Sequence, residues 1–206
     1  MKKKPLLISG IVFLVVVFVV LNYSETSKPR TGIDFTYTDL QTIKTMLNSK
    51  NIFVSSPTTI SDDTVNQYCM YFDDQNNQQI MSTCLTTSVT DINGNPLGNF
   101  NIGGDPQNAL MAVALLESAP LLDSKFDMME SVFEAMISAL VCDCWDEKHP
   151  GGFVSVNHWM QAAKEHHVDS GRDSTKSRIS GLAEKEIVLE ITKTRDSYLW
   201  TLIIIK

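Results

Sequence analysis

The sequence predicts an α+β fold made of an N-terminal transmembrane helix, a three-stranded antiparallel meander, a helical segment and a C-terminal β-hairpin. Three observations support this prediction: a charge-free apolar run near the start, alternating apolar residues in the first half, and helix-period apolar residues in the second half. The chain has 206 residues, a net charge of −7, 43% hydrophobic residues and 20% charged residues. This balance excludes collagen-like, low-complexity and disordered chains, and the length allows one ordinary domain.

The N-terminal region has the features of a membrane anchor. Three lysines precede Pro5–Leu21, a run of 17 residues without a charged side chain. As a helix this run spans roughly 25 Å, which is enough to cross the apolar core of a bilayer. A buried helix of a soluble domain would show a polar stripe, and none is visible. A cleaved signal peptide is the main alternative, although the end of the run lacks the small residues of a cleavage site. A helix of a soluble domain is the third interpretation of this run.

These features predict the domain organisation and the membrane topology. We expect a basic flank at residues 1–4, a transmembrane anchor at 5–22, a polar stalk at 23–33 and a single α+β domain at 34–206. The flanking lysines favour a cytoplasmic N-terminus and an extracytoplasmic C-terminal domain. Beyond residue 22 the chain carries 14 basic and 24 acidic side chains. Such an acidic domain is a poor candidate for binding anionic lipid or nucleic acid.

The first half of the domain favours strands. Apolar residues at helical spacing predict a helix over 37–48, and a short strand is expected at 52–54. Alternation over 65–72 and 80–90, followed by a strand at 97–102, predicts the three-stranded meander. The dipeptide Asn93-Gly94 is typical of a type I′ hairpin turn, because both of its central residues need positive φ.

The second half favours helices. Asp105-Pro106 is a good helix start, because Asp caps the first turn and Pro needs no partner for its missing N–H, so we expect a helix that ends before Pro120. Further helices are predicted over 123–144, 155–168 and about 173–183. Alternation from Ile187 to Ile191 and the apolar run Tyr198–Ile205 predict the closing hairpin.

The four cysteines admit structural and metal-binding interpretations. Cys69 and Cys84 lie on adjacent predicted strands and could form a disulfide, which an extracytoplasmic domain permits, or remain two buried thiols. A second set has the spacing C-x-C-x4-H-x8-H and could supply four tetrahedral metal ligands, namely Cys142, Cys144, His149 and His158. Positions i and i+2 do not share a helix face, so a structural or disulfide role for Cys142 and Cys144 is the favoured alternative.

Motifs of common enzymes are absent from the sequence. It contains no G-x-S-x-G nucleophile elbow, no H-E-x-x-H zinc motif and no phosphate-binding P-loop. Paired aspartates lie in polar turns, where solvation explains them better than acid–base chemistry. We therefore expect a non-catalytic domain without a cofactor.

The last third resembles a winged helix-turn-helix in outline. Residues 125–206 read as a long helix, then SVNHWMQAAKEHHV and STKSRISGLAEKE as two more, and IVLEITKTRDSYLWTLIIIK as a strand, a wing and a second strand. The resemblance implies DNA binding by a basic face, whose candidates are Arg172, Lys176, Arg178, Lys193 and Arg195. Residues 151–206 hold eight basic and seven acidic side chains, and such alternation is more typical of a solvated surface.

The whole chain also resembles uncharacterised membrane-anchored proteins of ammonia-oxidising archaea, with a lysine-led anchor followed by an acidic, Asn- and Thr-rich domain. That resemblance implies no activity. From the sequence we expect a single-pass membrane protein whose acidic, extracytoplasmic domain binds a protein partner. The alternatives are a membrane-tethered, winged-helix-like DNA-binding regulator and an extracytoplasmic metal-binding protein.

Overall fold

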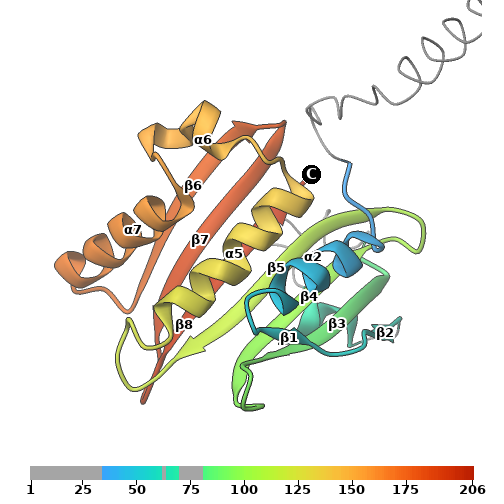
Figure 1. The fold of residues 1–206 in the computed structure, drawn as a ribbon, viewed down its shortest axis with the longest axis horizontal. Coiled ribbons are helices and arrows are strands. Elements are labelled where there is room, and N and C mark those ends of the chain that lie inside the picture. The colour runs from blue at the N-terminus through green and yellow to red at the C-terminus, as the bar shows by residue number, and fades with distance from the viewer. Residues whose placement is uncertain (1–33, 62–63, 70–80) are drawn as a thin grey trace, which may run out of the picture. The chain divides into compact units, whose positions relative to one another are not determined.

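The computed structural model describes residues 34–61, 64–69 and 81–206, and these residues form one antiparallel sheet with helices (Figure 1). The strand order is β1-β3-β4-β5-β8-β7-β6, and β2 also pairs with β3. The eight strands are β1 (Phe53–Val54), β2 (Thr58–Ile60), β3 (Thr83–Thr90), β4 (Pro96–Gly104), β5 (Ala109–Ser118), β6 (Ser174–Leu182), β7 (Lys185–Lys193) and β8 (Tyr198–Ile205).

Three longer helices cover one face of this sheet (Figure 1). Two short helices and a 3₁₀ turn at Pro150–Gly152 complete the described elements. The helices are α2 (Asp39–Asn48), α3 (Val65–Tyr68), α5 (Phe126–Leu140), α6 (Trp145–Lys148) and α7 (Val156–Ser170).

The main hydrophobic core lies between the helices and the sheet. Trp159 of α7 and Trp200 of β8 are fully buried there, and each indole N–H has a partner. Trp159 Nε1 donates to Ser177 Oγ at 2.7 Å, and Trp200 Nε1 donates to the Leu122 carbonyl at 3.1 Å. Buried aromatic side chains of this size contribute most of the apolar area that stabilises a domain.

A smaller core lies on the opposite face of the sheet. It includes Met111, Val188 and Ile203 from the central strands, together with Val65 of α3. A disulfide between Cys69, which follows α3, and Cys84 of β3 fastens the short helix to the sheet. Both cysteines are fully buried.

The predicted arrangement of elements is wrong. The sequence predicts a three-stranded meander separate from a C-terminal hairpin, whereas the structure joins their strands in one eight-stranded sheet. Strand β5 connects the two parts, because it pairs with β4 on one side and with β8 on the other. Its pairing with β8 runs from Met111↔Ile205 to Ser118↔Tyr198. The predicted helix before Pro120 is therefore a central strand.

The error at β5 has a local physical cause. The Asp105 carboxylate accepts hydrogen bonds from the backbone N–H groups of Gln107 and Asn108, as a helix cap would, but here it closes a tight turn into a strand. The apolar residues that follow are buried on both faces of the sheet, so they show no alternation. A continuous apolar run of this length is compatible with either a strand or a helix.

Two further elements differ from the prediction. The helix expected near 173–183 is the edge strand β6, whose alternate residues Thr175 and Ile179 face the helices. The first strand expected in the meander begins as helix α3, and its continuation lies outside the described residues. The resemblance to a winged helix relied on a helix where β6 lies.

Several predicted elements within the described residues are confirmed. Helices α2, α5 and α7 occupy the three amphipathic segments, and β7 and β8 form the C-terminal hairpin. The Asn93-Gly94 turn joins β3 to β4 as predicted, but only Gly94 has a positive φ, of 79°, so the turn is not of the predicted type I′. No helix in the described part of the chain is both long and apolar enough to cross a membrane. The predicted anchor at 5–22 lies outside the described residues.

Candidate functional site: an acidic cleft

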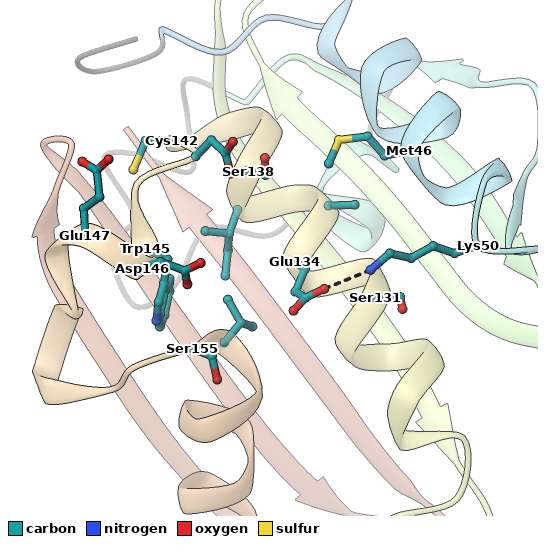
Figure 2. Close-up of a pocket in the computed structure, with 14 residues that line it drawn as sticks. Met46, Lys50, Ser131, Glu134, Ser138, Cys142, Trp145, Asp146, Glu147 and Ser155 are labelled. Atoms are coloured by element: carbon teal, nitrogen blue, oxygen red, sulfur yellow. Dashed lines mark hydrogen bonds and ion pairs between the residues drawn. The ribbon is translucent and has the colours of Figure 1, made fainter. Parts of the chain in front are cut away.

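A cleft of about 440 Å³ opens between the helices on the covered side of the sheet (Figure 2). Its walls come from the end of α2 and the residues just after it, one face of α5, the segment between α5 and α6, helix α6, and the start of α7. The lining residues are Met46, Lys50, Ser131, Glu134, Ala135, Ile137, Ser138, Cys142, Asp143, Trp145, Asp146, Glu147, Ser155 and Val156.

The base of the cleft is apolar. Ala135, Ile137, Trp145 and Val156 are all buried. Trp145 Nε1 donates to the Phe153 carbonyl at 3.0 Å, and its ring centroid lies 5.6 Å from that of Trp159. The indole is therefore fixed in orientation, with its polar atom satisfied. A surface of this kind can pack against the methylene groups of a long side chain.

The rim of the cleft is strongly acidic. Four carboxylates line it, from Glu134, Asp143, Asp146 and Glu147, against a single ammonium group, that of Lys50. Lys50 Nζ lies 3.0 Å from Glu134 Oε2, and both side chains are well exposed. An exposed pair of this kind is worth only about 0–1 kcal/mol, so a ligand cation can compete for Glu134 at small cost.

Serine hydroxyls add neutral hydrogen-bonding groups to the walls. Ser131 and Ser138 lie on α5, and Ser155 lies on the opposite wall. Ser155 is the N-cap of α7, and its hydroxyl accepts a hydrogen bond from the His158 N–H at 3.0 Å. A hydroxyl can still donate while it accepts, so these side chains can bind carbonyl groups of a peptide.

The predicted metal ligands do not form a metal site. Cys142 and Cys144 are bonded to each other in a disulfide, so neither is a free thiolate. The His158 ring packs edge-on against Phe153, with centroids 5.5 Å apart, and His149 is the αL residue that ends α6. In the part of the chain described, no three His, Cys, Asp or Glu side chains converge on one point.

Cys69 and Cys84, the other candidate disulfide partners, are joined in the structure, but they lie on other elements than expected. Cys69 follows a helix instead of lying on a strand, and Cys84 faces Gly103 across β3 and β4. Both sulfurs lie in the smaller core, away from the cleft.

The candidate nucleic-acid-binding residues lie at the β6–β7 side of the sheet, beyond the cleft. Lys176 Nζ is 3.5 Å from Glu190, and Arg178 is 3.1 Å from Glu186, so two of the cations have carboxylate neighbours. Of the other three, Lys193 is the last residue of β7, and Arg172 and Arg195 lie in connections at the same end of these strands. Acidic partners thus offset part of this basic surface.

Sequence reasoning did not find the cleft. Its two walls are separated by about 85 residues in the chain, as Lys50 and Glu134 illustrate, and only the packing of α2 on α5 brings them together. One signal was available: three acidic residues lie within a few positions of the cysteine pair, in Cys142-Asp143-Cys144-Trp145-Asp146-Glu147.

Comparisons with known proteins add no functional information. A scan against family models, a search of curated proteins and a search of solved structures each found no match. The geometry and charge of the cleft therefore provide the strongest indication of function.

Proposed function

We propose that this chain is a single-pass membrane-anchored protein whose extracytoplasmic domain binds a cationic segment of a protein partner in the acidic cleft. In this proposal the role of the cleft itself is binding. The observation that supports the proposal most is the composition of the rim, where four carboxylates and one ammonium group surround an apolar base.

The cleft suits lysine and arginine side chains in particular. Their methylene stems pack on apolar surface while the charged heads reach carboxylates. Trp145 and Ile137 give the cleft apolar lining, and Asp146 and Glu147 line it as well. Figure 2 shows the Asp146 carboxylate beside the Trp145 ring. Complementary charge also accelerates the encounter of two proteins and makes it sensitive to salt. The long-range attraction is favoured further by the net negative charge of the domain.

Peptide binding by the full-length protein in detergent tests the proposal. Fluorescence anisotropy would compare a labelled lysine-rich peptide with a glutamate-rich peptide of equal length. We expect the lysine-rich peptide alone to bind at low salt, and binding to weaken as salt is raised. The double variant Asp146→Asn with Glu147→Gln should reduce its affinity about tenfold, as loss of 1.4 kcal/mol would do.

The matched control is the double variant Glu165→Gln with Asp169→Asn, which removes two exposed carboxylates of α7 outside the cleft. It should leave the affinity unchanged within a factor of two or so, because it affects only the overall charge. Equal binding of both peptides, or equal loss in the control and the cleft variant, would contradict the proposal.

The membrane part of the proposal rests on the charge-free run Pro5–Leu21 and the lysines before it. Protease treatment of intact cells that carry an epitope at the C-terminus tests it. We expect the epitope to be lost from intact cells, and to remain in the membrane fraction when protease is omitted. An epitope that is protected until the membrane is opened would contradict the extracytoplasmic placement.

A further inference from the structure

The two disulfides of the described chain differ in burial and in span. Cys69–Cys84 joins positions 15 apart, and both side chains are completely buried. Cys142–Cys144 joins positions only 2 apart, and Cys144 is partly exposed. A buried bond that closes a longer loop stabilises the fold, whereas an accessible bond in a very small ring adds little stability and is open to exchange.

The backbone around Cys142–Cys144 is held without the disulfide. The N–H groups of Val141 and Cys142 both donate to the Ile137 carbonyl, at 2.9 and 3.1 Å, and so complete the last turn of α5. On the other side, the Lys148 N–H donates to the Cys144 carbonyl at 3.0 Å, and the buried Trp145 fixes α6 to the core. We therefore expect both helices to keep their positions when the bond opens.

The position of this disulfide links it to the candidate site. Cys142 and Asp143 line the acidic cleft, and Figure 2 shows Cys142 on the same wall as Asp146 and Glu147. A peptide bound in the cleft would thus lie beside Cys142, and Cys144, the more exposed sulfur of the pair, follows two positions later, outside the lining of the cleft.

We propose that Cys142–Cys144 is a redox-active disulfide that accepts two electrons from a dithiol in the cationic segment bound by the cleft. The substrate class rests on the proposed function; the redox activity rests on the disulfide itself. The outcome for the partner is a new disulfide bond, and the outcome for this chain is a pair of thiols at Cys142 and Cys144.

The exchange proceeds in two balanced steps. A partner thiol loses its proton, and its thiolate attacks Cys144 Sγ; the bond to Cys142 breaks, and the Cys142 thiolate that leaves takes up a proton. The second partner thiol, also deprotonated, then attacks the partner sulfur of the mixed disulfide. Cys144 leaves as a thiolate and takes up the second proton. Each protein molecule oxidises one dithiol, and no further co-reactant is involved.

The close spacing of the two cysteines suggests how a mixed disulfide at Cys144 can be trapped. Cys142 lies two positions from Cys144. In the first intermediate, its thiol can therefore attack the mixed disulfide at Cys144 and release the partner again. Without Cys142, a dithiol cannot be oxidised, but Cys144 can be held in a mixed disulfide with glutathione. The variant Cys142→Ser should therefore accumulate a glutathione adduct at Cys144 when it is incubated with oxidised glutathione.

The decisive experiment uses the full-length protein in detergent, oxidised at the start, with synthetic dithiol peptides as probes. One peptide carries two cysteines among lysines, and the other carries them among glutamates. Acid quenching, alkylation and mass spectrometry count the disulfides in protein and peptide. We expect one peptide disulfide per protein molecule, formed about tenfold faster for the lysine peptide. Cys142–Cys144 should open while Cys69–Cys84 stays closed.

The paired variant Cys142→Ser with Cys144→Ser should abolish this oxidation and retain the wild-type circular dichroism spectrum. If the wild-type protein oxidises neither peptide, or if Cys69–Cys84 opens first, the redox proposal is wrong. Exchange at equal rates with both peptides would support the redox activity and contradict the cationic partner, so the two proposals can fail separately. If the paired variant does not fold, the order in which the two disulfides of the wild-type protein open still tests the redox proposal.

Discussion

At the residue scale, two buried polar contacts bind helix α7 to the edge of the sheet. Trp159 Nε1 donates to Ser177 Oγ at 2.7 Å, and His167 Nδ1 lies 3.0 Å from Thr175 Oγ1. Trp159 is fully buried and His167 almost so. Because a polar atom loses its hydrogen bonds to water on burial, each of these contacts satisfies a group that would otherwise destabilise the fold.

The contact of Trp159 gives a prediction for stability. Replacing Ser177 by Ala removes the acceptor and leaves a buried indole N–H without a partner, which costs about 1–3 kcal/mol of the free energy of unfolding. Chemical denaturation followed by tryptophan fluorescence measures it. The control Ser180→Ala alters an exposed hydroxyl of the same strand and should change stability little. Equal effects of the two variants would show that the contact is unimportant.

His167 predicts a pH dependence of stability. Burial lowers the pKa of His167 below its ordinary value of 6.5, and the nearby Lys193 lowers it further; His166 acts in the same direction, whereas Asp173 opposes the shift. The unfolded chain therefore binds a proton at a pH where the folded chain does not. Stability from this residue is fully present above pH 6.5 and declines as the pH falls below that value.

The variant His167→Gln tests this dependence. Urea midpoints of the variant and the wild-type protein would be compared from pH 8 to pH 5.5. We expect the wild-type protein to lose more stability over this interval than the variant, because only the wild-type chain can take up the additional proton on unfolding. Parallel pH profiles would mean that His167 contributes no pH dependence.

At the element scale, the short helix α3 depends on a glycine and a disulfide. A Cβ atom at Gly103 of β4 would lie 2.6 Å from Cys69 Cβ and 2.7 Å from Cys69 Sγ, closer than such atoms approach. Gly103→Ala should therefore displace α3 and reduce the free energy of unfolding by roughly 1–3 kcal/mol, as overpacking does. Denaturation would be compared with Asn99→Ala, at an exposed position of the same strand. Equal stability of the two variants would contradict this packing.

The two disulfides should contribute unequally to stability. Loss of Cys69–Cys84, by replacing both residues with Ser, frees a longer loop and should cost about 3 kcal/mol, whereas the same change at Cys142 and Cys144 should cost about half of that or less. Thermal unfolding of the two paired variants measures the difference. If the second pair proved the more important one, the redox role proposed for it would lose its main structural argument.

The elements that the sequence predicted correctly are mostly those with one apolar and one polar face. Helices α2, α5 and α7 each have one buried face, so helical spacing revealed them, and Asn93-Gly94 revealed the β3–β4 turn. Strand β5 is buried on both faces and shows no period, so its apolar residues suggested a helix. Helix α3 has only four residues, too few for a periodic signal.

At the scale of the whole molecule, long-range pairing decides both the sheet and the cleft. The pairing of β5 with β8 joins strands about 90 residues apart, and the cleft needs α2 beside α5. Local sequence patterns do not specify which distant segments meet, which is why neither feature was predicted. The residues of the cleft were visible in the sequence only as an acidic stretch after α5.

The central claim is that the acidic cleft receives a cationic segment, and amide hydrogen exchange tests it most directly. The full-length protein in detergent would be compared with and without an excess of the lysine-rich peptide. We predict slower exchange in the last turn of α2, the second half of α5 and residues 142–147, with β1 to β4 unchanged. Protection confined to the β6–β7 side of the sheet, or no protection anywhere, would contradict the claim.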